Sequence, residues 1–322
     1  MTKVVRIHEH GGPEVLQVED VALADPGPGE VLLRNQAVGL NFFDTYQRTG
    51  IYPIDLPAAL GTESAGVIEA VGPGVEDLAP GDRVYNASQG SYCEAMVVPV
   101  GNLTRLPDDV DVRDAAAAMS KAMTVQALVE SCYPVTSGDV VVLHAAAGGV
   151  GLIACQWLKS LGARIIGTVG SDEKADLARA NGCDIALVVP RDDLVVCVMD
   201  ETGGVGVPVV FDSVGNDSFA SSLKSLRRRG TLVSFGQASG LVEPFRPNIL
   251  AAHGSLYLTR PLLDDFIATP EDAAHCVGRV FEMMANGTVK IHIGQTYPLA
   301  DTAQAHRDLE GRKTKGSTVL LP

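Results

Sequence analysis

The chain has 322 residues, of which 46% are hydrophobic and 20% are charged, so it is long enough for two globular domains. Its formal net charge of −14 repels phosphate backbones and excludes nucleic acid as an expected partner. No apolar run approaches the roughly 20 residues of a membrane helix. Six scattered cysteines without a C-x-x-C pair favour free thiols over disulfides or zinc, and we expect a cytoplasmic protein with neither a leader nor a membrane segment.

The first 123 residues predict a domain of short strands. Apolar segments at residues 30–34, 66–71 and 82–85 are separated by turns that are rich in glycine and proline. Strands with this spacing are typical of a partly closed antiparallel barrel.

Residues 139–170 predict a strand, a turn, a helix and a second strand. Residues 140–143 and 164–169 are apolar, and a helical pattern runs between them. The turn carries Ala146-x-Gly148-x-x-Gly151, the spacing of a dinucleotide turn with alanine in the first position. A tight turn can need glycine for its geometry alone, but the full context favours a helix N-terminus that binds a pyrophosphate.

The residues after the second strand bear on which nucleotide binds. An NAD site usually carries an acid about 20 residues past the turn, which holds the ribose 2′-hydroxyl. Here residues 168–171 are small and uncharged and Lys174 follows, which favours a 2′-phosphate and therefore NADP. Alternatively, Ser171 caps the next helix, Asp172 and Glu173 favour its dipole, and Lys174 is solvated. Those two acids count against the phosphate.

Strands and helices continue to alternate up to residue 261. The apolar segments 185–189, 208–212 and 230–236 predict the remaining strands of an α/β fold with a Rossmann doubly wound parallel sheet. Arg227, Arg228 and Arg229 are interpreted as the C-terminus of a helix, where cations favour the dipole.

The last sixty residues are expected to return to the first domain. They predict helices at 272–286 and 301–310 and a closing strand at 317–321. The predicted division is therefore residues 1–123 with 262–322 as one domain, and residues 124–261 as the nucleotide-binding domain.

Motifs along almost the whole chain carry a family resemblance. They are HEHGGPEVLQ (8–17), NFFDTYQRTGIYP (41–53), LGTESAG (60–66), PGDRV (80–84), the dinucleotide turn, FDSVG (211–215), SFGQASG (234–240), GSLYLTRP (254–261) and GSTVLLP (316–322). With them the chain resembles the zinc-independent quinone oxidoreductases of the medium-chain dehydrogenase/reductase superfamily, to which zeta-crystallin is related. The resemblance implies a GroES-like partly closed β-barrel catalytic domain, a Rossmann domain, NADPH as cofactor and a homodimer.

The zinc alcohol dehydrogenases of the same superfamily hold their metal with side chains that this chain lacks. In those enzymes the positions matching Asp44 and Thr62 are cysteine and histidine ligands, and a lobe with four cysteines stands where Cys93 is alone here. Without such ligands there is no tetrahedral site. We therefore expect no metal, and hydride delivery to an acceptor that is already electrophilic.

The resemblance places cofactor contacts on segments spread over the chain. They are Phe42, Asp44, Thr124, Gly148, Gly149, Val150, Gly151, Gly170, Ser171, Lys174, Ser213, Phe235, Gly236, Gln237, Leu258, Thr259, Arg260 and Arg312. Lys174 and Arg312 are implied to hold the 2′-phosphate. Val189 stands where a tyrosine usually closes the phosphate pocket, which weakens the preference for NADP over NAD. Residues 121–127 lack an aromatic that usually lies near the nicotinamide, which indicates a different acceptor preference.

Asn41, Tyr46 and Tyr52 are the candidate catalytic residues, on or near a short helix that is implied to face the nicotinamide. Hydrogen-bond donors near the acceptor oxygen lower the barrier to its reduction. Asn41 would orient the cofactor or acceptor, and Tyr46 or Tyr52 would supply a proton or donate a bond. Alternatively, the tyrosines only line an aromatic cleft. Asp44 is interpreted as a local cap rather than a base, and no histidine is assigned a catalytic role.

The predicted function is that of an NADPH-dependent quinone reductase, which transfers hydride or electrons to a small-molecule quinone or a related electrophile. One alternative is an NADPH-dependent reductase of α,β-unsaturated carbonyls, such as enones and alkenals, because both reactions reduce an activated acceptor. Another is a non-catalytic NADPH-binding protein of a crystallin-like or RNA-binding kind. The pI of about 4.9 counts against RNA, and the presence of Asn41 and Tyr46 counts against lost turnover.

Residues 254–259 predict the contact between the two copies of a homodimer. Polar and aromatic side chains alternate there with Leu256 and Leu258, at an expected edge of the Rossmann sheet. An unpaired edge can pair with the same edge of a second copy across a two-fold axis. The alternative is an edge that is covered within a monomer.

Overall fold

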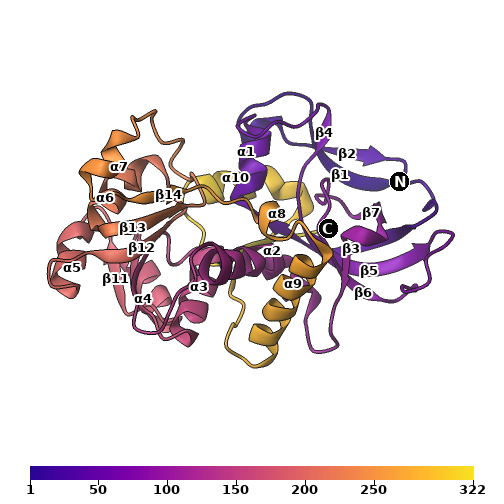
Figure 1. Cartoon of the computed structure of the whole chain (residues 1–322). Coiled ribbons are helices and arrows are strands. Elements are labelled where there is room, and N and C mark those ends of the chain that lie inside the picture. Colours follow the sequence, from indigo (N-terminus) through magenta and orange to yellow (C-terminus); the bar gives the residue numbers. More distant parts are fainter. The chain divides into compact units, whose positions relative to one another are not determined.

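A computed structural model describes all 322 residues of the chain, which divides by its contacts into two compact units (Figure 1). Unit 1 comprises Met1–Ser120 and Ile291–Pro322, and unit 2 comprises Lys121–Lys290. No helix combines the length and the apolar character that crossing a membrane requires.

Unit 1 is built on two sheets, of seven and three strands. The larger sheet has the order β15-β16-β3-β5-β6-β8, with β7 also paired to β3. Its strands are β3 (Glu30–Leu40), β5 (Ser64–Val71), β6 (Arg83–Asn86), β7 (Ala95–Pro99), β8 (Leu103–Arg105), β15 (Ile293–Pro298) and β16 (Ser317–Leu321). The smaller sheet has the order β2-β1-β4, with β1 (Thr2–Ile7), β2 (Gln17–Val21) and β4 (Ala58–Ala59).

The pairing in unit 1 is antiparallel except between β15 and β16. The register of β3 against β5 shifts twice, and such irregularities bend a strand. Alternate residues of β3, including Val31 and Leu33, are buried in an apolar cluster with Ile68 and Val84. The predicted strands at 30–34, 66–71 and 82–85 are confirmed as parts of β3, β5 and β6.

Two helices of unit 1 matter for the site: α1 (Phe42–Arg48), directly after β3, and α10 (Thr302–Glu310). Short 3₁₀ turns lie at Pro13–Val15, Val100–Asn102 and Leu299–Asp301. Helix α2 (Val112–Gln126) contains the boundary between the units and continues into a π-helical turn, Ala127–Cys132.

Unit 2 is a six-stranded parallel sheet with helices in its connections. The strand order is β11-β10-β9-β12-β13-β14, so the order reverses between β9 and β12. The strands are β9 (Val140–Leu143), β10 (Arg164–Val169), β11 (Ile185–Val188), β12 (Val207–Asp212), β13 (Leu226–Ser234) and β14 (Tyr257–Thr259). The helices are α3 (Gly149–Ser160), α4 (Asp172–Ala180), α5 (Leu194–Glu201), α6 (Asn216–Ser225), α7 (Asn248–Ala252), α8 (Leu263–Phe266) and α9 (Pro270–Ala285). The predicted doubly wound sheet is confirmed.

The segment that holds α8 and α9 lies in unit 2, whereas the predicted division placed everything after residue 261 with the first domain. Side-chain contacts explain the difference. Arg279 on α9 binds the carboxylate of Glu130 at 2.8 Å and stacks over Trp157 of α3. The thiol of Cys276 faces the carbonyl oxygen of Met123.

The interpretation of Arg227–Arg229 as the end of a helix is wrong. Helix α6 ends at Ser225, and the three arginines lie in the first half of β13. The pairing with β12 moves from Val207↔Leu226 directly to Val209↔Thr231, so the arginines occupy an irregular stretch with exposed side chains. Arg229 adopts a positive φ of 59° there.

Candidate active site

The dinucleotide turn lies between β9 and α3, next to the point where the strand order reverses. Gly148 is the N-cap of α3 and offers no side chain to cap the helix. A Cβ at Gly151 would collide with the carbonyl oxygen of Ala145, so only glycine lets the first turn of α3 pack against the end of β9. The open helix N-terminus, with Gly149 and Val150 in its first turn, is the arrangement that a pyrophosphate requires.

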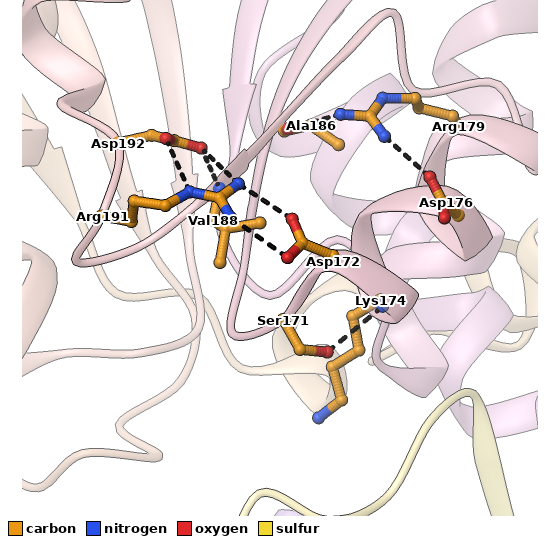
Figure 2. A network of polar contacts seen from close by, with 9 residues as sticks. All are labelled: Ser171, Asp172, Lys174, Asp176, Arg179, Ala186, Val188, Arg191 and Asp192. Carbon is orange, nitrogen blue, oxygen red and sulfur yellow. Dashed lines mark hydrogen bonds and ion pairs between the residues drawn. The ribbon is translucent and has the colours of Figure 1, made fainter.

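The next connection, between β10 and α4, contains three predicted cofactor residues. Ser171 is the N-cap of α4, and its Oγ accepts a hydrogen bond from the backbone N of Lys174 at 3.3 Å (Figure 2). The side chain of Lys174 is partly buried. A Cβ at Gly170 would meet no atom within 4 Å, so the approach to this residue is open. Ser171 therefore caps the helix and also stands beside an open position.

The turn after β12 is held by the buried carboxylate of Asp212. It accepts hydrogen bonds from the backbone N of Val214 at 2.8 Å and from the hydroxyl groups of Ser218 and Ser222 at 2.7 and 2.9 Å. These bonds fix the predicted contact residue Ser213 at the carboxyl end of β12.

Six further predicted residues lie around the ends of β13 and β14. A Cβ at Gly236 would lie 2.6 Å from the carbonyl oxygen of Ser213, so the loops after β12 and β13 pack closely. The guanidinium of Arg260 donates to the carbonyl oxygen of Ser234 at 2.8 Å and to Oε1 of Gln237 at 3.4 Å. The structure thus brings these residues together with Phe235, Leu258 and Thr259 around the carboxyl ends of β13 and β14.

In unit 1, helix α1 carries Asn41 at its N-cap and Asp44 in its first turn. Asp44 accepts from the backbone N of Asn41 at 2.8 Å, as expected for a cap. Its carboxylate is buried and also accepts from Thr62 at 3.3 Å and from the hydroxyl of Tyr92 at 2.8 Å. Burial raises the pKa of Tyr92 well above its usual range, so the phenol keeps its proton.

The side chain of Asn41 is oriented by a buried glutamate. Its Nδ2 donates to Oε1 of Glu63 at 2.8 Å. The other carboxylate oxygen of Glu63 accepts from the hydroxyl of Tyr85 at 3.3 Å and from the backbone N of Ser120 at 3.1 Å. This network fixes the amide plane of Asn41 with its oxygen turned away from Glu63.

The candidate tyrosines pack against each other. The rings of Tyr46 and Tyr52 meet edge to face with centroids 5.5 Å apart, and the Tyr52 backbone N donates to the Tyr46 carbonyl oxygen at 3.1 Å. Phe42 and Phe43 extend the aromatic cluster, at 6.3 Å from Tyr46 and 5.3 Å from Tyr52. Tyr46 is buried, whereas Tyr52 is partly exposed. Phe42 and the two tyrosines therefore belong to one aromatic cluster of unit 1.

Two predicted contacts come from segments away from these loops. Thr124 lies on α2, with a partly exposed side chain. Arg312 follows α10 in unit 1, is exposed, and has a positive φ of 58°.

A network of hydrogen bonds that no sequence pattern indicates joins α1 to α10, with Arg48 and His306 buried and Glu310 exposed. Arg48, which is 1% exposed, donates to both carboxylate oxygens of Glu310 at 3.0 and 2.7 Å and to Nδ1 of His306 at 3.0 Å. Because arginine only donates, His306 carries its proton on Nε2, which faces the Tyr92 oxygen at 3.2 Å. Burial, with Arg48 nearby, lowers the pKa of His306 to about 3.

Comparison with known proteins fits this geometry. The model of the zinc-binding dehydrogenases matches residues 149–259, and the model of the alcohol dehydrogenase GroES-like domain matches residues 27–108. A quinone oxidoreductase of Pseudomonas aeruginosa is 46% identical over the full length of both chains. The chain belongs to the quinone oxidoreductase family.

Two further relatives of this quinone oxidoreductase family member, one of them a solved structure, are similar over the whole of this chain. The structure of Escherichia coli quinone oxidoreductase complexed with NADPH is 43% identical, covers all of both chains and has a TM-score of 0.96. A 2-haloacrylate reductase of Burkholderia sp is 40% identical over all of this chain and 99% of its own length.

Although one matching model is named for zinc, the donor set of this quinone oxidoreductase family member does not fit the metal. No group of three or more His, Cys, Asp or Glu side chains is placed to hold an ion. Asp44 and Thr62, which stand in the ligand positions, bond to each other instead. A hydroxyl is a poor zinc ligand by type, and tetrahedral zinc sites use Cys, His or carboxylate groups.

Proposed function

We propose that this chain is an NADPH-dependent quinone oxidoreductase that works without a metal ion. One observation carries the proposal: the predicted cofactor residues of unit 2, apart from Thr124, gather at the carboxyl ends of the parallel strands, around the point where the strand order reverses. In open α/β sheets ligands bind at this point. The full-length similarity to quinone oxidoreductases, one of them solved with NADPH, supports the same reading.

Each part of the cofactor then has residues suited to it. The N-terminus of α3 behind Gly148–Gly151 would take the pyrophosphate, because its backbone N–H groups and dipole favour negative charge. Ser171 and Lys174 would take the 2′-phosphate. Ser213, Gly236 and Gln237 and the β14 residues would flank the rest of the dinucleotide.

The bound cofactor would supply hydride to the quinone. The residues of unit 1 would act on the acceptor oxygen, which gains negative charge as it is reduced. Asn41, held by Glu63, would orient the cofactor or the acceptor. Tyr46 or Tyr52 would donate a hydrogen bond or a proton, and Tyr52, the more exposed of the two, is the better placed to exchange its proton with solvent.

Reduction of an activated alkene is the second candidate. The similarity to a 2-haloacrylate reductase favours it, because that substrate is an alkene conjugated to a carboxylate. Both reactions use the same cofactor site, so only the acceptor pocket separates them.

Loss of NADPH absorbance under steady-state conditions tests the proposal. The purified protein should be assayed with 1,4-benzoquinone and naphthoquinones beside enones, alkenals and 2-haloacrylate. We expect kcat/KM for the quinones to exceed that for the alkenes by about tenfold or more, the scale of a few favourable pocket contacts. A higher kcat/KM for any alkene would move the chain to the second candidate.

The assembly and location are part of the proposal. β14 pairs with β13 on one side and with no strand of this chain on the other, which suits a homodimer with a sheet continued across a two-fold axis. All six cysteines are free thiols, which suits the reducing cytoplasm.

A further inference from the structure

The first residue of α4 raises a question about nucleotide choice. Asp172 follows Gly151 by 21 residues and comes directly after the N-cap Ser171. An acid at about this distance from the glycine turn is what NAD sites use to hold the ribose 2′-hydroxyl. A carboxylate there would also repel a 2′-phosphate bound at Ser171 and Lys174.

Arg191 engages both oxygens of that carboxylate. Its guanidinium lies 2.9 Å from Oδ1 and donates to Oδ2 of Asp172 at 3.1 Å, in the two-pronged geometry that is strongest for this pair (Figure 2). The hydrogen bonds from Arg191 lower the pKa of Asp172. The carboxylate is thus ionised and turned toward the arginine.

The arginine itself is anchored from the loop after β11. Asp192 accepts from the backbone N of Val188 at 2.7 Å, which fixes its carboxylate at the end of the strand. Nε of Arg191 donates to Oδ1 of Asp192 at 3.2 Å. Figure 2 shows the guanidinium between the two carboxylates, one from the β11 loop and one from α4.

We propose that Arg191 determines the preference for NADPH over NADH by masking Asp172. It offsets part of the charge of the carboxylate and occupies the oxygens that would otherwise accept a bond from a ribose hydroxyl. Ser171, Lys174 and the N-terminus of α4 then receive a 2′-phosphate with less repulsion from the same helix turn. In this proposal Arg191 is a specificity residue that acts through Asp172, and it rests on the proposed use of NADPH.

The residue at position 189 gives the pairing of Arg191 with Asp172 a particular importance in this chain. The residue stands where the resemblance expects a tyrosine to close the phosphate pocket, and its side chain is 37% exposed. Arg191 lies two residues further along the same loop. The loop after β11 would thus support phosphate binding by compensating the charge of Asp172, where an aromatic side chain is absent.

Direct nucleotide binding without a quinone tests the proposal. Dissociation constants for NADPH and NADH would be measured by calorimetry for the wild type, Arg191→Ala, and Arg191→Ala combined with Asp172→Asn. Baring the carboxylate beside a phosphate dianion should weaken NADPH binding about tenfold at low salt. NADH binding should stay within about twofold or become tighter, and removing the Asp172 charge should restore NADPH binding to within about threefold of the wild type.

Arg179→Ala is the matched control. Arg179 lies on α4, the helix that carries Asp172, and it is exposed and pairs with Asp176 at 2.9 Å (Figure 2). Its removal changes the net charge by the same amount as the removal of Arg191. It should leave the ratio of the two dissociation constants unchanged. Melting temperatures would show that each variant is folded.

The outcomes separate the alternatives. Unchanged NADPH binding in Arg191→Ala, or equal losses for both nucleotides, would overturn the proposal. A double variant as weak as Arg191→Ala would also overturn it, since the arginine would then contact the phosphate itself. Wild-type protein that binds neither nucleotide would instead overturn the proposed function.

Discussion

The hydroxyl of Tyr92 donates to the carboxylate of Asp44 at 2.8 Å, in the part of unit 1 where zinc relatives would hold their metal. Both side chains are completely buried. The tyrosine also accepts from His306, which is held by Arg48. A chain of hydrogen bonds thus connects the first turn of α1 to α10, and it is the physical support of the helix that carries Tyr46.

Removing the Tyr92 hydroxyl should destabilise the protein. In Tyr92→Phe the buried Asp44 carboxylate loses the donor that lies 2.8 Å from it, and a hydrogen bond to a charged group contributes about 1.5–3 kcal/mol. Urea unfolding should show a free energy of unfolding lower by that amount. Tyr257→Phe, which changes an exposed tyrosine, should leave it within about 0.5 kcal/mol. An equally small change in Tyr92→Phe would show that Asp44 does not depend on this bond.

Acid should destabilise the protein through His306. Its pKa is about 3 in the folded chain and near 6.5 when unfolded, so between these values only the unfolded chain binds the proton. Its contribution to stability is complete above about pH 6.5 and is lost as the pH falls toward 3, with a slope approaching 1.4 kcal/mol per pH unit.

The free energy of unfolding of His306→Asn should therefore fall less steeply than that of the wild type between pH 6 and 4. The difference in slope should correspond to about one proton bound on unfolding. The measurement is urea unfolding across this range. His275→Asn, at an exposed position on α9, serves as the control. Parallel curves for wild type and His306→Asn would contradict the assignment.

Lys174 should discriminate between the two nucleotides. If its ammonium binds the 2′-phosphate, Lys174→Ala loses a charge-assisted bond, and KM for NADPH should rise about tenfold or more while KM for NADH changes little. Lys159→Ala is a suitable control, because Lys159 is an exposed lysine on α3 that pairs with Asp184. Equal losses with both nucleotides would assign Lys174 another role.

Zinc should have no part in the activity. Elemental analysis of the purified protein should find far less than one zinc per chain, and a chelator should leave quinone reduction unchanged, because Asp44 and Thr62 bond to each other. About one tightly bound zinc per chain, with activity lost on its removal, would contradict this.

The dimer proposal is best tested at Tyr257. Replacing Leu256 with proline would be a poor test of pairing at the β14 edge. Leu256 is buried in the core of unit 2, and its backbone N donates to the carbonyl oxygen of Leu250 at 3.0 Å. Tyr257 is 57% exposed on the edge strand β14, and a lysine on an edge disfavours strand pairing. Light scattering should give about twice the 33.7 kDa chain mass for the wild type and a shift toward one chain mass for Tyr257→Lys.

The sequence predicts best what depends on local patterns. The dinucleotide turn is recognisable because Gly148 and Gly151 stand between two apolar strands, and the doubly wound parallel sheet follows from alternating strands and helices. Local charge patterns were less reliable. Three arginines suit a helix end, but the bulge between β12 and β13 places them in a strand.

Contacts between distant segments had no signal in the sequence. Arg48 and Glu310 are 262 positions apart, and no spacing rule links them. The pair formed by Arg191 and Asp172 is similar: each residue reads alone as an ordinary surface charge, and only the fold shows that the arginine covers the acid. Asp44 was interpreted correctly as a cap because its partner Asn41 is three residues away.

The position of β16 determines when the seven-stranded sheet of unit 1 can be completed during synthesis. The strand consists of the last residues before the C-terminus, yet it lies between β15 and β3 within the seven-stranded sheet. All segments of unit 2 leave the ribosome before it does, so that unit can fold while Val38–Leu40 of β3, beyond the stretch that pairs with β7, still lack their partner. Until Ser317–Leu321 pairs, that end of β3 is open to strands of other chains. The closing of this end of the sheet therefore waits for a strand that follows the whole of unit 2 in the sequence.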